Sequence, residues 1–233
     1  MFAYIQQFYF KSHLLSKAQF DDMCAHGKVI EQDERGIKVM ILANGDFLKI
    51  FRVRHLISGA QLYTHARRFC RNAKRLESLN IPTVSVKKLF YFEDSQHTAV
   101  LYEPLPGETL KQYLRNYLLD NEALAQKLGQ FMARLHFNGV HFHSLHTGNV
   151  VITPQGEVGL IDISDMSMYP WPLFCNTRVR SFKRLCRYSE DIKILGQEFW
   201  QGLQHHYFEH SFSSPMCKRK IQNANQKLIH FSD

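Results

Sequence analysis

A short proline- and glycine-rich segment separates two parts of this chain that have different hydrophobic patterns. Residues 103–107 read Glu-Pro-Leu-Pro-Gly, and two prolines with a glycine in five residues favour a linker. Short apolar runs typical of strands precede it, and apolar residues at helical spacing follow it. We therefore expect an α+β fold, with a sheet-rich unit over residues 1–103 and a mainly helical unit over residues 104–233.

The first part is expected to contain five strands and one helix. The apolar runs predict strands at 27–31, 37–43, 47–52, 84–92 and 98–102. Asn44-Gly45 lies between two of these runs, and this dipeptide is a strong hairpin signal. Apolar residues recur at helical spacing from Ser58 to Leu79, and Pro82 predicts that this helix ends before it.

After the linker the pattern becomes helical. Thr109 can cap a helix over 110–118, and residues 122–137 form a longer amphipathic pattern. Short strands are expected at 150–152 and 158–161, on either side of a Thr-Pro-Gln-Gly turn. The rest is expected to be mostly helical and basic.

Composition excludes several classes of protein. No stretch reaches the roughly 18–20 consecutive apolar residues of a membrane span, and the first residues do not resemble a secretory signal. The 18 Phe and 10 Tyr exclude a disordered chain. The five cysteines are scattered without a Cys-x-x-Cys pair, so we expect free thiols in a reducing cytosol, with neither disulfides nor a thiolate zinc site.

The net charge of +8 is unevenly distributed. Between Arg52 and Leu76 there are seven basic residues and no acidic one. Such a patch attracts nucleic acid, anionic lipid or phosphorylated glycan, and it can equally be a solvated surface without a partner. No helix-turn-helix, zinc-finger or RNP signature accompanies the charge, so we do not expect nucleic acid as a partner.

The most specific signal is the segment His141–Asn149, which reads His-Phe-His-Ser-Leu-His-Thr-Gly-Asn. It follows the longer helical pattern and leads into the predicted hairpin, after which comes Asp162. Asn149 and Asp162 should then lie at the same end of two adjacent strands. An amide oxygen and a carboxylate placed together are suitable ligands for Mg²⁺.

These motifs resemble those of small-molecule and glycan kinases in the protein-kinase-like superfamily. His141–Asn149 is similar to their His-Gly-Asp-Leu-His-Pro-Gly-Asn catalytic loop, and Ile161-Asp162-Ile163 to their metal-binding Ile-Asp-Phe motif. With Glu103–Leu110 included, roughly residues 20–200 resemble the bacterial lipopolysaccharide-core (heptose or Kdo) kinases, in particular the toluene-tolerance or lipopolysaccharide-biosynthesis group. The resemblance implies a two-lobed kinase-like fold with its cleft near 103–107.

The resemblance also implies a cytoplasmic phosphotransferase that uses ATP and Mg²⁺. Its acceptor would be a sugar of the lipopolysaccharide core glycan or its lipid-linked precursor, reached through peripheral contact with the anionic inner membrane. Lys49, an isolated lysine in an apolar strand pattern, matches the phosphate-binding lysine, although a lone strand lysine is common. Asn149 and Asp162 match the metal ligands, His146 would lie near the transferred phosphate, and Glu103 is assigned to nucleotide binding.

Three positions depart from the kinase pattern. Ser144 stands where the catalytic Asp belongs, Asn72 stands where the Glu that pairs with Lys49 belongs, and no Gly-x-Gly-x-x-Gly loop is present. His143 or His146 could replace the missing base, since histidine titrates near neutrality. Asp165 could supply a second carboxylate to the metal.

Each departure also has a less specific interpretation. The loop histidines can be structural residues, and a transition-metal site at His141, His143 and His146 lacks a spaced acidic or cysteine partner. Ser144 and Asn72 also favour an alternative function. In that hypothesis the chain is a pseudokinase that binds nucleotide or proteins and scaffolds envelope-glycan assembly.

Overall fold

The computed structural model describes residues 10–52, 65–95, 97–116 and 121–226. The chain divides into two compact units, unit 1 over residues 1–105 and unit 2 over residues 106–233. The division falls inside the proline-rich segment. Helices and strands occur in both units, which confirms the expected α+β class.

Unit 1 contains a six-stranded sheet in the order β1-β5-β6-β4-β3-β2. The strands are β1 (Ser12–Leu15), β2 (Lys28–Asp33), β3 (Gly36–Ile41), β4 (Phe47–Phe51), β5 (Ser85–Phe92) and β6 (Thr98–Glu103). Neighbours pair antiparallel, except that β1 runs parallel to β5. The predicted Asn-Gly hairpin joins β3 to β4, and Gly45 adopts the positive φ of 84° that this turn requires.

Two helices accompany this sheet, α2 (Lys17–His26) and α3 (His65–Ser78). The predicted helix is confirmed over 65–78, whereas 58–64 lie outside the described residues. It ends as expected before Pro82, because Asn80 takes a φ of 53° and the Ile81 N–H bonds back to the Leu76 carbonyl at 2.9 Å.

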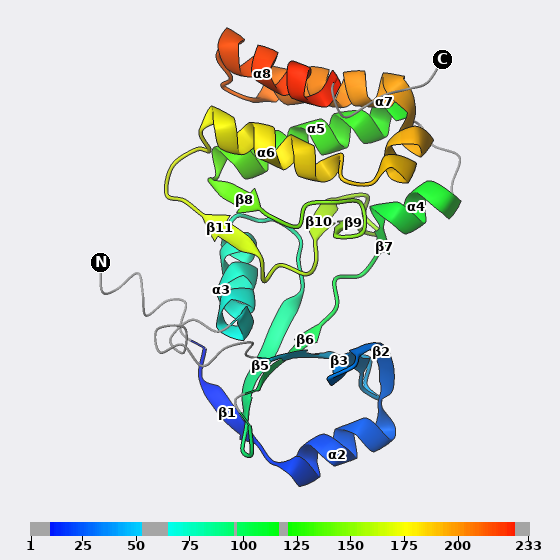
Figure 1. Cartoon of the computed structure of the whole chain (residues 1–233), viewed down its shortest axis with the longest axis vertical. Helices are drawn as coiled ribbons and strands as arrows, with labels where there is room; N and C mark the ends of the chain where they lie inside the picture. Colours follow the sequence, from blue (N-terminus) through cyan, green and yellow to red (C-terminus); the bar gives the residue numbers. More distant parts are fainter. Residues whose placement is uncertain (1–9, 53–64, 96, 117–120, 227–233) are drawn as a thin grey trace. The chain divides into compact units, whose positions relative to one another are not determined.

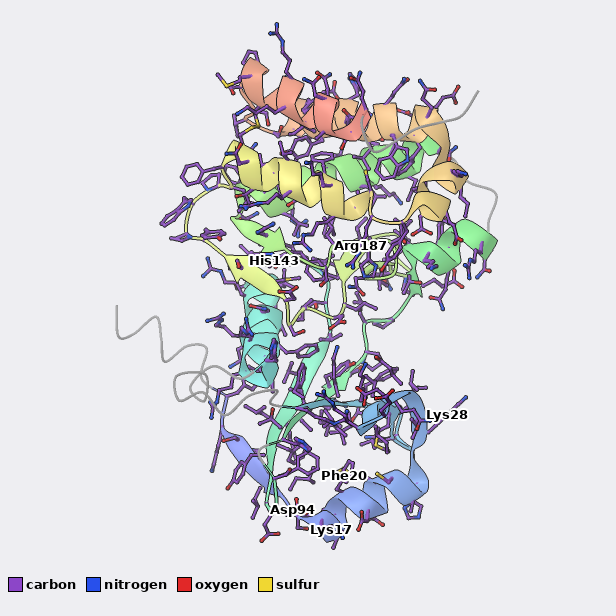
Figure 2. All side chains as sticks on the ribbon, in the orientation of Figure 1. Lys17, Phe20, Lys28, Asp94, His143 and Arg187 are labelled. Carbon is purple, nitrogen blue, oxygen red and sulfur yellow. A yellow bond between two sulfur atoms is a disulfide. The ribbon has the colours of Figure 1, made fainter. Side chains whose placement is uncertain are left out.

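The expectation of five strands and one helix in this unit was wrong, since β1 and α2 were missed. Strand β1 has only four residues, and its partner β5 lies more than 70 positions away. Helix α2 has no buried residue, so its hydrophobic pattern is weak. Its start nevertheless carries a capping box of Ser16 and Gln19. Phe20 anchors it through an edge-to-face contact with Phe92 at 5.0 Å (Figure 2).

Unit 2 combines five helices with short strands in its described part (Figure 1). The helices are α4 (Leu110–Asn116), α5 (Asn121–Phe137), α6 (Cys175–Leu185), α7 (Ser189–His210) and α8 (Pro215–Gln226). One small sheet joins β10 (Val158–Leu160), β9 (Val150–Ile152) and β7 (Glu108–Thr109), and another joins β8 (Val140–Phe142) to β11 (Met166–Met168). The predicted β9–β10 hairpin and helix α5 are confirmed, and Thr109 caps α4 as expected.

Two glycines allow close backbone approach in unit 2. Gly107 has a φ of 131°, and a Cβ there would collide with the carbonyl of Ile152 on β9. A Cβ at Gly129 on α5 would lie 2.7 Å from the Leu203 carbonyl on α7. Both positions therefore require glycine, which has no Cβ. Gly129 in this way lets α5 and α7, the two longest helices of the unit, pack tightly.

The expectation of five free thiols was wrong. Cys175 at the start of α6 and Cys217 in α8 form a disulfide with a Cα–Cα distance of 5.5 Å, while Cys24, Cys70 and Cys186 are free. The two partners are 42 positions apart, so no local motif marks the pair. Across the described residues, none of the helices combines the length and apolarity that a membrane crossing demands.

Candidate functional site

The hairpin β9–β10 brings Asn149 and Asp162 to one end of unit 2's three-stranded sheet. Val150 pairs with Leu160, and the register continues one step outward through a 3.1 Å hydrogen bond from the Ile161 N–H to the Asn149 carbonyl. Asp162 follows immediately and is exposed, with a φ of 52°. A positive φ is uncommon outside glycine and often marks functional positions. The two predicted ligands therefore lie at the same hairpin end, as the sequence indicated.

The loop determines which atom of Asn149 can bind a cation. Its amide nitrogen lies 2.9 Å from the Ser144 carbonyl oxygen and 3.1 Å from Nε2 of His146. The amide nitrogen thus donates one hydrogen to the Ser144 carbonyl, and Nε2 of His146 accepts the other in the tautomer that carries its hydrogen on Nδ1. Oδ1 takes part in neither bond and remains able to coordinate a cation, although the Asn149 side chain is largely buried.

His146 is held as a neutral ring. Its Nε2 faces the Asn149 amide, and its Nδ1 faces the backbone N–H of Gly148 at 3.2 Å. Burial and the positive charge of Arg187 lower the pKa of His146, against the opposing effect of Asp162. A neutral ring carries a hydrogen on one nitrogen, so it accepts from only one of these two donors, and protonation of the accepting nitrogen would break that bond. His146 therefore orients Asn149 and is poorly suited to be a base.

The Ser144 side chain contacts the carboxylate of Asp165. Its hydroxyl donates to Oδ2 of Asp165 at 3.3 Å, and the Asp165 carbonyl accepts the His143 backbone N–H at 3.0 Å. Asp165 precedes β11, which pairs with β8 just before the loop. The position at which the kinase resemblance predicts an Asp is thus occupied by a serine with an exposed acid beside it.

The other two loop histidines pack against each other, with ring centroids 4.2 Å apart. Nε2 of His143 lies 2.9 Å from the Ser167 hydroxyl, and burial lowers the pKa of His143. Burial, followed by the charges of His143 and two arginines, lowers the pKa of His141 to about 4. The predicted base His143 is therefore already hydrogen-bonded, whereas the buried Nε2 of His141 has no hydrogen-bond partner among the described residues.

Thr147 ties the loop to two helices. Its buried hydroxyl donates to the buried carboxylate of Asp191 in the first turn of α7, and its carbonyl accepts the Lys111 N–H of α4 at 3.1 Å. Sequence reasoning missed Asp191. An acidic residue near the start of a helix is common. The only other signal for the burial of Asp191 was its place beside apolar residues in the sequence.

Basic side chains surround the loop on two sides. Lys111 and Arg187 lie over the Tyr188 ring, which itself makes an edge-to-face contact with His146 at 5.3 Å. Arg180 and Arg184 of α6 act on His141 and His143. Figure 2 shows His143 at the end of β8 and Arg187 at the connection between α6 and α7. This distribution of charge favours an anionic ligand near the loop.

Lys49 belongs to unit 1 and lies on β4 between Val39 and Val100 of the neighbouring strands. Its Nζ is 5.9 Å from the centre of the Phe69 ring on α3. Asn72, one turn after Phe69, is buried on the same helix, whereas Glu77 is exposed. The structure therefore places an amide, and no carboxylate, at the predicted partner position, and Glu77 points elsewhere as expected.

Glu103 ends β6 in unit 1, and its side chain is exposed. Its carboxylate lies 3.8 Å from Lys87, whose Nζ also contacts the buried Asp46 at 2.6 Å. The hydrogen bond to Asp46 raises the pKa of Lys87. Glu103 thus joins a surface ion-pair network, and its predicted role in nucleotide binding stays a prediction.

A separate group of possible metal ligands lies on α7. His205, His206 and Glu209 bring ligand atoms within 4.8 Å of one another, and His206 is also bonded to Glu122 at 2.8 Å. Within the described ranges, no other set of three His, Cys, Asp or Glu residues does so. Asn149 and Asp162 supply a different donor set, in which one ligand is an amide.

No protein-family model matches this chain, and no curated protein sequence matches it.

Proposed function

We propose that this chain is an ATP-dependent phosphotransferase with a kinase-like fold, acting on an inner-core sugar of lipopolysaccharide. The observation that carries the proposal is the pairing of Asn149 and Asp162 at one end of the β9–β10 hairpin. The resemblance of the loop to glycan-kinase loops supplies the reaction class, and the basic side chains around the loop support an anionic substrate.

The donor set fits Mg²⁺. One amide oxygen and one carboxylate are hard oxygen ligands, which Mg²⁺ prefers, and it commonly binds through few protein groups plus phosphates. When bound, the ion would neutralise charge on the nucleotide phosphates. His146 contributes by fixing the Asn149 amide, so that Oδ1 is directed away from the loop's own hydrogen bonds.

Asp165 is the group that can accept the acceptor's proton. In the transfer, a sugar hydroxyl forms a new bond to the γ-phosphorus, the bond from that phosphorus to the β-phosphate oxygen breaks, and the hydroxyl proton goes to a base. In the neutral ring of His146, one nitrogen carries a hydrogen and the other accepts from Gly148 or Asn149. His143 is bonded to Ser167. Asp165, beside Ser144, is an exposed carboxylate, so we assign it this role in place of metal binding.

Lys49 is proposed to bind the α- and β-phosphates of ATP. Because it belongs to the other unit, this role is a separate prediction with a variant of its own. The acceptor is proposed to be the core glycan or its lipid-linked precursor. The proposed location is cytoplasmic, with peripheral contact with an anionic membrane. Helix α3 carries a cluster of basic residues that suits such a membrane, where each cation contributes about 1 kcal/mol. They are Arg67, Arg68, Arg71, Lys74 and Arg75.

The second candidate function is a pseudokinase that binds nucleotide or proteins and scaffolds envelope-glycan assembly. The buried Asn72 favours it, because an amide cannot form the ion pair that orients the lysine in active kinases. The neutral Ser144 in the loop favours it as well.

The test is transfer of the γ-phosphate from ATP to purified inner-core oligosaccharide. The wild type should transfer phosphate only with Mg²⁺ present, and Asp162→Ala and Lys49→Met should each abolish transfer. Nucleotide binding without any transfer would support the pseudokinase. Unchanged transfer by Asp162→Ala would contradict both the metal site and the proposal.

A further inference from the structure

A pocket of about 690 Å³ lies between α7 and α8 in unit 2, and these two helices supply all its described lining residues. Helix α7 is broken at Gly196, whose φ of 74° is not helical, so its second segment begins at Gln197 on the pocket wall. The pocket shares no residue with the candidate phosphotransfer site. Its volume falls in the range of small-molecule sites.

Side-chain amides dominate the lining. Helix α7 contributes Gln197, Gln201 and Gln204, which recur at helical spacing on one face. Helix α8 contributes Gln222, Asn223, Asn225 and Gln226. Each amide offers two donors and one acceptor oxygen, so the wall can both donate and accept hydrogen bonds at many points.

Asn225 is a buried amide in this wall whose polar atoms are unpartnered in the described part of the chain. Its side chain is only 1% exposed, and within the described residues neither Oδ1 nor Nδ2 has a hydrogen-bond partner. A buried amide without partners destabilises the folded chain, and such groups are rare in native structures. A polar ligand whose hydrogen bonds reach this amide in the pocket wall would remove that cost.

The lining also contains aromatic surface but almost no charge. Phe208 is partly exposed at the pocket, and Trp200 lies deeper in the same wall. Lys, Arg, Asp and Glu are absent from the described lining residues, and His205 is the one titratable side chain. Lys218 contacts the Phe208 ring at 5.6 Å but does not line the pocket.

We propose that this pocket binds a neutral sugar unit of a glycan. Sugar hydroxyls both donate and accept hydrogen bonds, which matches a wall of amides, and the apolar C–H face of a sugar ring matches an aromatic side chain. A phosphate or nucleotide would require cations that the wall lacks. The proposal is independent of the phosphotransferase proposal, because it concerns different residues and is measured without nucleotide.

The experiment is a titration of the full chain with maltotriose, cellotriose and mannotriose, followed through the side-chain amide signals in ¹⁵N NMR spectra. At least one trisaccharide should shift the pocket amide signals with a dissociation constant of millimolar order. Gln201→Ala, which removes an exposed side chain, should weaken binding severalfold. Gln126→Ala, an exposed amide on α5 outside the pocket, is the matched control and should bind as the wild type does.

Asn225→Leu supplies a second readout. This variant replaces the unpartnered amide by an apolar side chain of similar size, so it should raise the melting temperature of the free protein and weaken sugar binding by about tenfold or more. A lower melting temperature would show that Asn225 already has its partners and would overturn the proposal. Failure of all three sugars to bind, equal binding by Asn225→Leu, or displacement of the sugar by adenosine would overturn it too.

Discussion

The Ser144 hydroxyl lies 3.3 Å from the carboxylate of Asp165, so a serine and an acid from different segments meet at the loop position for which the proposed kinase resemblance predicts one aspartate. In the sequence, Ser144 replaces the aspartate that the resemblance predicts as the base. In the structure, the carboxylate of Asp165 lies beside this serine. Asp165 was expected to be a metal ligand, and the contact makes it the better candidate for the base.

Asp165→Asn should lower phosphate transfer while leaving MgATP binding unchanged. General-base assistance is typically worth about 10²–10⁴-fold in rate, and the amide cannot supply it. The measurement is the transfer rate at saturating MgATP, together with the affinity for the nucleotide. A variant that loses nucleotide binding instead would return Asp165 to the role of metal ligand.

Ser144→Asp should act differently in two backgrounds. In the wild type it places two carboxylates in contact, and their repulsion opposes any gain. In Asp165→Asn that repulsion is removed, so the double variant should recover much of the lost transfer. If neither background shows transfer, the pseudokinase hypothesis is favoured.

Thr147→Val should destabilise the protein by about 1–3 kcal/mol. It would leave the buried carboxylate of Asp191 without its hydroxyl donor, and an unsatisfied buried acceptor carries a cost of this order. The measurement is urea unfolding. Thr98→Val on β6 is the control, since no side-chain hydrogen bond of Thr98 occurs in the described structure, and it should change stability little. Equal stability of the two variants would argue against a stabilising hydrogen bond between Thr147 and Asp191.

Stability should fall as the pH is lowered below about 6.5, because two buried histidines resist protonation in the fold. Burial lowers the pKa of His136 to about 3, and burial with nearby positive charge lowers the pKa of His141 to about 4. The unfolded chain takes up these protons near pH 6.5 and the folded chain does not, so each histidine costs about 1.4 kcal/mol per pH unit in this window. Unfolding free energies measured from pH 7 to pH 4 test the slope.

His136→Phe combined with Tyr207→Phe removes one of these histidines together with its hydrogen-bond partner. The double variant should show a shallower dependence on pH, whereas His210→Gln, an exposed control on the same unit, should leave the slope as it is in the wild type. An unchanged slope in the double variant would mean that carboxylates alone determine the acid sensitivity.

The disulfide should stabilise unit 2 under oxidising conditions. A cross-link between residues 42 positions apart restricts the unfolded chain by about 3–4 kcal/mol in the chain-entropy treatment. Cys175→Ser should therefore lower the melting temperature without reductant and have little effect with it. Alkylation of the unfolded, unreduced wild type should label Cys24, Cys70 and Cys186 only, and labelling of all five would contradict the bond.

Local patterns predicted the elements whose signals lie within one stretch of chain. Alternation, the Asn-Gly turn and helical spacing identified β2 to β6, the β9–β10 hairpin, α3 and α5. Strand β1 and the three-residue pair β8–β11 were not predicted, because their pairing depends on partners distant in sequence.

The candidate site likewise combines a placement that local sequence spacing predicted with contacts that it did not predict. Asn149 and Asp162 were predicted to lie together because they flank the two strands of one hairpin, and the spacing of a hairpin can be read from the sequence. The contacts of Ser144 with Asp165 and of Thr147 with Asp191 join residues 21 and 44 positions apart, and the Cys175–Cys217 bond joins residues 42 apart. No local rule links such pairs, so only the folded arrangement reveals them.

The most direct test of the central claim is calorimetric titration with ATP, with and without Mg²⁺, on the wild type and Asp162→Ala. Asp94→Ala, an exposed aspartate in the β5–β6 turn, is the matched control. We predict binding that requires Mg²⁺, that is lost in Asp162→Ala, and that is retained in Asp94→Ala. Absence of binding by the wild type, or equal binding by Asp162→Ala, would contradict it.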